Sequence, residues 1–158
     1  MVITKTVKKH IIIFSLAFFI FFLDRFIKGY VQTAFDLGKS VQIIPSFFSI
    51  TYLHNTGAGF SLFQNMQLVL ILISLLALFL IYYYFSDLPK KPYIHAAIGL
   101  ILGGILSNLY DRVFLGYVVD YLDFHIWPIF NLADSALSVG IIFLIYYFWK
   151  EESAAKNK

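Results

Sequence analysis

The sequence lacks cysteine entirely and contains few charged residues. Because none of the 158 residues is cysteine, disulfide bonds, thiolate metal sites and thiol catalysis are all excluded. Charged residues make up only 13% of the chain, and the formal net charge is +3. The basic residues lie near the two ends and in one short loop, so we do not expect nucleic acid as a partner.

Apolar residues, in contrast, are abundant. Hydrophobic residues account for 60% of the sequence and aromatic residues for 20%, which is more than a soluble domain of this length can bury. Four apolar stretches approach the ~20 residues that cross a bilayer, at about 10–30, 68–85, 94–112 and 132–149. The first has no small-residue cleavage site, which predicts a retained helix rather than a signal peptide. We expect residues 1–158 to form one integral membrane domain.

The lysines predict how these helices are oriented. Groups of lysines precede the first predicted helix, lie between the second and third, and follow the fourth: Lys5, Lys8 and Lys9; Lys90 and Lys91; Lys150, Lys156 and Lys158. With four spans, all of them fall on one side of the membrane. Because positive residues favour the cytoplasmic side, we expect both termini to be cytoplasmic.

Two segments between the helices have strand character, at about 38–65 and 117–128. The first contains the β-branched and aromatic run 47–53, followed by the turn sequence NTGAG. The second begins YVVDYLDF. We therefore predict a mainly α membrane protein in which four transmembrane helices carry a small extracytoplasmic β cradle.

Charged residues gather at one depth of the predicted bundle. With a rise of about 1.5 Å per residue, Asp24 lies roughly 20 Å along the first helix, and Asp111 and Arg112 lie about 25–27 Å along the third. Asp134 falls in the first turn of the fourth helix, and Asp120 reaches the same level from a strand. Charges inside membrane spans are costly and indicate function by default.

Spacing groups these residues further, although simpler roles account for some of them. Asp24 and Lys28 are four residues apart and share a helix face. Lys28 and Arg112 could extend to the interface, and Asn131 with Asp134 could cap a helix. These roles do not explain why so many polar groups converge at one depth.

Paired carboxylates predict a chemistry. Two carboxyl groups that meet in a low-dielectric place cannot both ionise at low cost, so one keeps its proton near neutral pH. Such a pair can activate water and protonate a developing oxyanion, which is aspartic protease chemistry without metal or cofactor. The histidines are scattered without HExxH spacing, so we predict no metal site: His10, His54, His95 and His125.

Several motifs resemble those of lipoprotein signal peptidase, also called signal peptidase II. They occur in the family's order over nearly the whole chain: DRFIK, HNTGAGF, GGILSNLYDRVFLGYVVDYLDF and FNLADS. The resemblance implies a bacterial cytoplasmic-membrane aspartic endopeptidase with an extracytoplasmic active site. It would cleave a diacylglyceryl-modified prolipoprotein before the lipidated cysteine. The implied partners are this substrate and membrane lipids, with the enzyme as a monomer.

The resemblance also implies a role for each matching residue. Asp120 and Asp134 would form the catalytic pair. Residues at the substrate site would be Asn55, Asn108, Arg112 and Asn131. Structural support would come from Asp24, Lys28, Asp111, Gly57 and Ala58. The chain departs from the family at His54, often Arg, and at Gly59, usually Ala; neither receives a role.

Two other function classes remain open at this point. A small ion-coupled transporter would place its polar residues near the membrane midplane, with polar groups leading to both sides. A non-catalytic assembly partner would use the charges only for structure. The sequence also leaves open which aspartate is the base, although a helix N-terminus favours an ionised Asp134.

Overall fold

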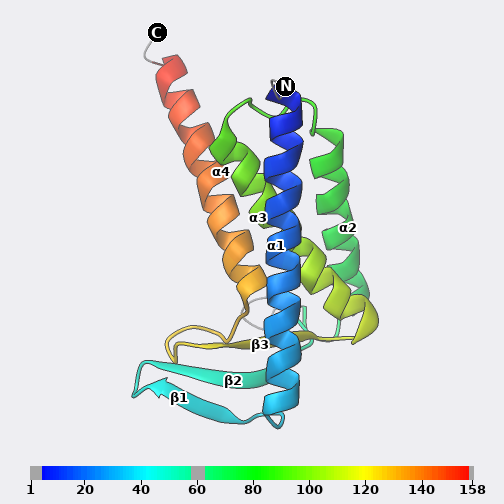
Figure 1. The fold of residues 1–158 in the computed structure, drawn as a ribbon, viewed down its shortest axis with the longest axis vertical. Helices are drawn as coiled ribbons and strands as arrows, with labels where there is room; N and C mark the ends of the chain where they lie inside the picture. The colour runs from blue at the N-terminus through cyan, green and yellow to red at the C-terminus, as the bar shows by residue number, and fades with distance from the viewer. Residues whose placement is uncertain (1–4, 58–62, 157–158) are drawn as a thin grey trace.

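A computed structural model describes residues 5–57 and 63–156. Over these ranges the chain forms four α-helices and a three-stranded antiparallel sheet (Figure 1). The helices are α1 (Lys5–Ala34), α2 (Gln67–Tyr83), α3 (Pro92–Phe114) and α4 (Leu132–Lys156). The strands are β1 (Ser40–Ile44), β2 (Phe48–Asn55) and β3 (Val118–Asp123). The predicted mainly α fold with a small sheet is confirmed.

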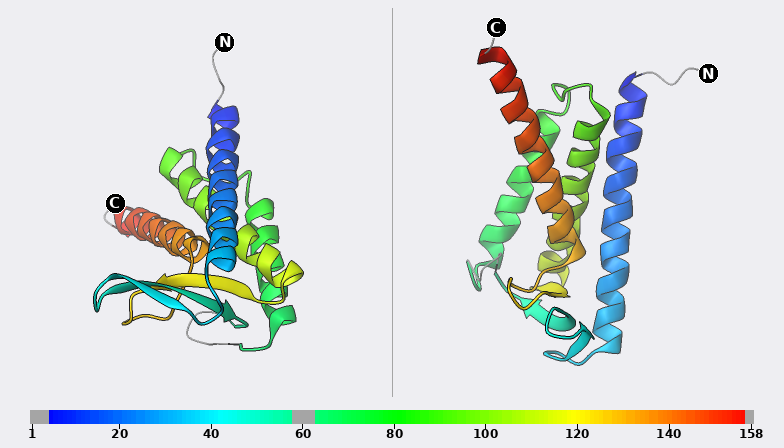
Figure 2. Two further views of the ribbon diagram at one scale, coloured as in Figure 1. Left: turned by 60° about the horizontal axis from the view of Figure 1, so that its bottom comes forward. Right: turned by 90° about the vertical axis from the view of Figure 1, so that its left-hand side faces the viewer.

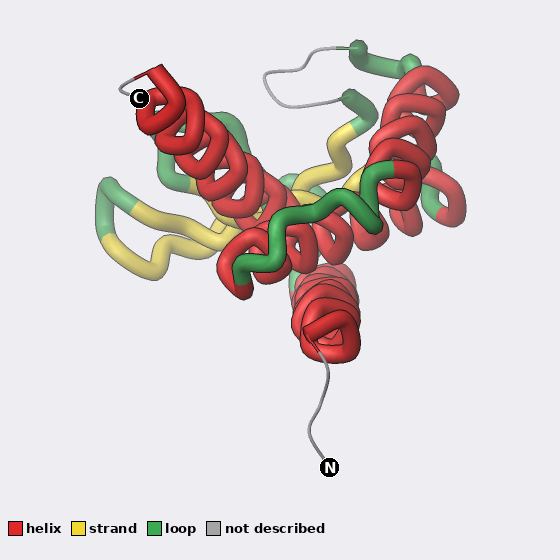
Figure 3. Tube along the Cα trace, turned by 90° about the horizontal axis from the view of Figure 1, so that it is seen from above, coloured by secondary structure: helices red, strands yellow, loops and turns green. Residues whose placement is uncertain are grey.

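The helices form a bundle whose central member is α3. It packs against α1, α2 and α4, and the view along the bundle shows the other helices arranged around it (Figure 3). The sheet lies across one end of the bundle, and both termini lie at the opposite end (Figures 1 and 2). Charged residues near the sheet-side ends of the helices are therefore brought close to the sheet.

Three helices within the described residues are long and apolar enough to cross a membrane. They are Val7–Ala34, Pro92–Phe114 and Leu132–Lys156. Large apolar side chains on their outer surfaces are exposed, such as Phe18 at 64%, as expected for helices that face lipid. α2 is more apolar than these three helices but has only 17 residues. That α2 also spans, and that both termini are cytoplasmic, stay predictions.

Glycines allow α3 to approach its neighbours closely. A Cβ atom on Gly99 would lie 2.8 Å from the Ile13 carbonyl oxygen of α1, and one on Gly103 would lie 2.7 Å from that of Ala17. On the other side, a Cβ on Gly104 would lie 2.5 Å from the carbonyl oxygen of Ala133 in α4. Small residues at such contacts are typical of membrane helix packing. The glycines of α3 therefore serve helix packing.

The sheet turns Asp120 away from a small apolar core. β1 ends at Ile44, directly before Pro45, which cannot donate to a strand ladder. β2 then pairs with β3, with Leu53 opposite Asp120. Val119 and Tyr121 join Val31 of α1 in a buried cluster on one face. Because successive side chains point to opposite faces, Asp120 lies on the other face.

The contact between Gly104 and Ala133 yields a test of the packing. Gly104→Ala places a methyl group against the Ala133 carbonyl and 2.8 Å from Leu137 Cγ, so α4 must move away from α3. Overpacking of this kind costs about 1–3 kcal/mol. We expect a lower melting temperature for the purified protein in detergent.

Gly29→Ala is the matched control. Gly29 lies in α1 with nothing within 4 Å of a Cβ atom, and alanine favours helix over glycine by about 1 kcal/mol. Its melting temperature should equal or exceed that of the wild type. Equal melting temperatures for Gly104→Ala and the wild type would contradict the close α3–α4 contact.

Candidate active site

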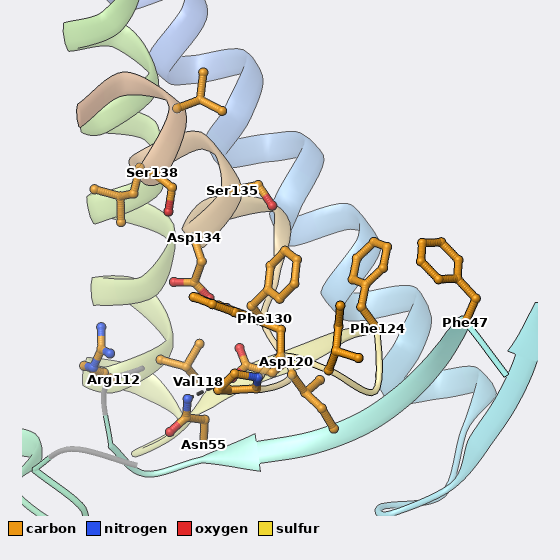
Figure 4. Close-up of a pocket in the computed structure, with 16 residues that line it drawn as sticks. Phe47, Asn55, Arg112, Val118, Asp120, Phe124, Phe130, Asp134, Ser135 and Ser138 are labelled. Carbon is orange, nitrogen blue, oxygen red and sulfur yellow. Dashed lines mark hydrogen bonds between the residues drawn. The ribbon is translucent and has the colours of Figure 1, made fainter. Parts of the chain in front are cut away.

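Asp120 and Asp134 line one cavity, at the end of the bundle that faces the sheet. The cavity has a volume of about 730 Å³. Figure 4 shows Asp120 entering from β3 and Asp134 from the first turn of α4, with Asn55 and Arg112 beside them. The rest of the wall is largely apolar, with side chains from the β3–α4 link and from α4: Phe124, Ile126, Trp127, Pro128, Ile129, Phe130, Leu137 and Val139.

The link between the two aspartates folds back onto β3. Phe130 donates its backbone N–H to the Leu122 carbonyl at 3.1 Å and accepts from the Leu122 N–H at 2.7 Å. His125, within the reversal, has a φ of 61°, in the left-handed region that reverses a chain. Asn131 therefore returns to the side of Asp120, although it comes eleven positions later in the sequence.

The carboxylate of Asp120 accepts two side-chain hydrogen bonds. Asn55 Nδ2 donates to one oxygen at 2.8 Å, and Asn131 Nδ2 donates to the other at 2.7 Å. The Asn55 amide is oriented in turn, because its oxygen accepts from the Gly57 N–H at 2.8 Å. Asp120 itself is 1% exposed. The site thus holds this carboxyl group by both oxygens in a buried position.

Asp134 belongs to a reciprocal cap at the start of α4. The Asn131 side-chain oxygen accepts from the Asp134 N–H at 2.9 Å, while Asp134 Oδ2 accepts from the Asn131 N–H at 3.2 Å. This is a capping-box arrangement, so the capping suggested by the sequence is present. The other oxygen, Oδ1, accepts from Asn108 Nδ2 at 2.8 Å. Asp134 therefore takes part in the cap of α4 and also lines the cavity.

The electrostatic surroundings favour a protonated Asp120 near neutral pH. Burial out of water is the largest cause, the negative charge of Asp134 is the second, and together they raise the pKa of Asp120 to about 7. The hydrogen bonds from Asn55 and Asn131 act in the opposite direction. A carboxyl pair of this kind can hold one proton while keeping one negative charge.

A buried cluster of charges adjoins the pair. Lys28 Nζ lies 2.7 Å from Asp24 Oδ2 and 2.9 Å from Asp111 Oδ2, and all three side chains are 0% exposed. The contact between Asp24 and Lys28 is the one that their spacing predicted. The cluster connects α1 to α3 directly beside the cavity.

Three partners of this cluster were not identified from the sequence. Arg25 forms an ion pair with Asp111, Ser107 Oγ donates to Asp24 Oδ2 at 2.6 Å, and the Tyr121 hydroxyl donates to Asp24 Oδ1 at 3.4 Å. Ser107 is four residues before Asp111, so helix periodicity could have placed it on the same face of α3 as Asp111. No local pattern marks Arg25 or Tyr121.

Arg112 lines the cavity, and one of its donors has no partner among the described residues. Its Nη2 donates to the Gly57 carbonyl at 3.3 Å. Its Nε is buried without a hydrogen-bond partner among the described residues, an unusual state for a guanidinium donor. Ala58 and Gly59 lie outside the described residues.

A metal centre has no evident ligands in the part of the chain that the structure describes. No group of three or more histidine, aspartate or glutamate side chains there is arranged to hold an ion. The polar side chains around the two aspartates are instead amides and cations that donate to carboxylates.

Comparisons with known proteins agree on one family. A family model described as signal peptidase (SPase) II matches residues 16–150. A lipoprotein signal peptidase of Halothermothrix orenii is 38% identical over 141 residues, covering 89% of this chain and 97% of that protein. One of Moorella thermoacetica is 41% identical over 132 residues, covering 83% and 88%.

Solved structures show the same architecture. A structure of a bacterial membrane enzyme superimposes with a TM-score of 0.85 at 34% sequence identity, covering 90% of each chain. A second bacterial membrane enzyme superimposes with a TM-score of 0.77 at 33% identity, covering 84% of this chain and 89% of that one.

The raised pKa of Asp120 predicts a pH-dependent effect on stability. An unfolded aspartate loses its proton near pH 4, whereas folded Asp120 keeps it up to about pH 7. Between these values the folded state binds more protons, so the wild-type free energy of unfolding falls as pH rises. Asp120→Asn removes this dependence. Its melting temperature, relative to that of the wild type, should be higher at pH 8 than at pH 5.

Asp123→Asn, which removes a carboxylate from the same strand, should be measured in parallel. Asp123 accepts hydrogen bonds from Thr51 Oγ1 and the His125 N–H. These partners differ from those of Asp120. If the difference between Asp120→Asn and the wild type is the same at both pH values, Asp120 is not protonated at neutral pH.

Proposed function

The chain belongs to the signal peptidase II family of membrane proteases, and on this premise we propose that it is an aspartic endopeptidase. Its proposed substrate is a diacylglyceryl-modified prolipoprotein, cut before the lipidated cysteine. Family membership follows from the match over residues 16–150. The catalytic type and the cleavage position are our proposal.

One observation carries the catalytic assignment. The Asn131 amide donates to Asp120 while its backbone N–H and side-chain oxygen hold Asp134, so one residue aligns both carboxyl groups in one cavity. Paired carboxyls in a buried site are the arrangement that general acid–base hydrolysis of a peptide requires.

The two aspartates would have different roles. Asp134 is held by donors on both oxygens at the start of α4, where the helix dipole favours a negative charge. We assign it as the base that removes a proton from water. Asp120, with its pKa raised to about 7, would protonate the carbonyl oxygen under attack.

The tetrahedral intermediate would then collapse as the C–N bond breaks. The proton taken up by Asp134 passes to the leaving amine of the cysteine, and the hydroxyl proton returns to Asp120. Water is thereby divided between the new carboxyl and amino termini, and both aspartates regain their starting states. No cofactor takes part in these steps.

Substrate backbone would be held by donors at the cavity. The guanidinium group of Arg112 and the amide of Asn55 line the cavity together with the two aspartates. Buried donors of this kind gain most when a substrate carbonyl completes their hydrogen bonds. Asn108 and Asn131 would act indirectly by orienting the aspartates.

The position of the cavity suits a substrate embedded in lipid. The wall contains Leu137 and Val139 of α4 and the apolar link after β3, so signal peptide and acyl chains would meet a largely apolar surface. Lys91 and Lys150 lie toward the opposite end of the bundle, which supports an extracytoplasmic cavity. An ion-coupled transporter fits less well, because the polar cluster stops at one end of the helices.

Conservative substitution of either aspartate tests this function. Asp120→Asn and Asp134→Asn should each lower cleavage of a lipidated prolipoprotein by about 10³-fold or more, because each removes one member of the acid–base pair. The measurement is the initial rate of product formation by purified protein, with folding checked by thermal unfolding.

Asp123→Asn is the control, since it removes a charge from β3 without touching the cavity wall, and it should retain cleavage. The chelator EDTA should leave wild-type cleavage unchanged. Substantial cleavage by either Asp120→Asn or Asp134→Asn would refute the catalytic assignment.

A further inference from the structure

A chain of buried hydrogen bonds connects Lys28 to the aspartate pair. Lys28 Nζ donates to Asn108 Oδ1 at 2.9 Å, and Asn108 Nδ2 donates to Asp134 Oδ1 at 2.8 Å. Asn108 Oδ1 also accepts from Asn131 Nδ2 at 3.2 Å, and Asn131 Nδ2 donates to Asp120. The ammonium group is thus one amide away from Asp134 and two amides away from Asp120.

Lys28 also fixes which way the Asn108 amide points. The ammonium group has only donors, so it can meet only the oxygen of the amide. The NH₂ group must then face Asp134. A reversed amide would place NH₂ against the ammonium group and an oxygen against the Asp134 carboxylate, leaving both contacts unfavourable.

The charges around the pair balance at one particular protonation state. The cations are Arg25, Lys28 and Arg112, and the carboxylates are Asp24, Asp111, Asp120 and Asp134. The cluster is neutral only when the carboxylates together hold a single proton. Tyr121, which also contacts Asp24, stays neutral because burial raises the pKa of its hydroxyl further above its usual value.

Neutrality matters because the centre of the cluster is buried, although Arg25, Arg112 and Asp134 at its edge are partly exposed. Lys28, Asp24, Asp111 and Asp120 are each 0–1% exposed, and an unbalanced charge without water is expensive. Asp24 and Asp111 are in direct contact with Lys28 or Arg25. The single proton therefore resides on Asp120 or Asp134, the members of the set without a cationic contact.

We infer that Lys28 is a positioning residue that keeps the Asp120–Asp134 pair singly protonated, both through its charge and by orienting Asn108. This role goes beyond holding α1 against α3, and it rests on the proposed function of the pair. Removing Lys28 would favour a second proton on the pair and so remove the base.

The inference predicts the direction in which the pH–rate profile moves. An aspartate pair loses activity at low pH when it gains a second proton and at high pH when it loses its last one. Removing a nearby positive charge makes the first event easier and the second harder. In Lys28→Met both limbs of the profile should therefore move to higher pH, by about one unit.

Asp24→Asn is the opposite perturbation. It removes a negative charge from the same contact, so both limbs should move to lower pH. Ser107 can donate to or accept from an amide at this position. The double variant Lys28→Met/Asp24→Asn restores the balance, with two cations and three carboxylates, and its profile should return toward that of the wild type.

The experiment measures kcat for a lipidated prolipoprotein peptide between pH 5 and 9 for these three variants and the wild type. At any pH on the acid limb of the wild-type profile, Lys28→Met should be about tenfold slower than the wild type, since a shift of one unit corresponds there to a factor of ten. Thermal unfolding reports stability separately. If Lys28→Met does not fold, the shift of Asp24→Asn to lower pH still tests the inference.

A uniform loss of kcat in Lys28→Met at every pH, with both limbs of the profile unmoved, would overturn the inference. That is the result expected if Lys28 had a purely structural role. The inference would also be overturned if the pH–rate profile of the double variant were shifted as far as that of Lys28→Met. The proposed function fails separately, through activity in Asp120→Asn or Asp134→Asn. If Asp120→Asn and Asp134→Asn lose cleavage but the pH–rate profiles of Lys28→Met and Asp24→Asn do not move, the inference is refuted and the proposed function stands.

Discussion

A buried ammonium group, that of Lys28, joins the elements that build the site. Charges away from water must be paired within the protein, and Lys28 meets Asp24 of α1 and Asp111 of α3. Asp24 in turn accepts from the Ala133 N–H of α4 and from the Tyr121 hydroxyl of β3. Helices that could slide along one another on apolar surface alone are fixed in register at this level, and the aspartate pair lies directly beside it.

Asn131 holds the two aspartates at a fixed position relative to each other. As the residue that caps α4 it must sit at the helix start, and the reversal of the β3–α4 link brings it against β3. Its amide then reaches Asp120 while its backbone holds Asp134. In the proposed mechanism, stability and catalysis would therefore depend on the same hydrogen bonds, and the residues that cap α4 would also set the distance between acid and base.

Local periodicity accounts for what the sequence could predict. The apolar stretches marked the helices, and the rise per residue placed the charges of α1, α3 and α4 at one level. The contact of Asp24 with Lys28 followed from helical spacing. The motifs indicated the family that the comparisons show. The contact of Arg25 with Asp111 escaped prediction because it depends on how α1 packs against α3, and that of Tyr121 with Asp24 because it depends on how β3 packs against α1.

The most direct test of this account is the mass of the product formed from a defined substrate. Purified wild-type protein in lipid nanodiscs would be incubated with a prolipoprotein peptide, either diacylglyceryl-modified at its cysteine or unmodified. The account predicts a single cut in the modified peptide, giving a fragment that begins with the lipidated cysteine, and little or no cleavage of the unmodified one. Cleavage at another bond, equal cleavage of both peptides, or no cleavage of the modified peptide would contradict it.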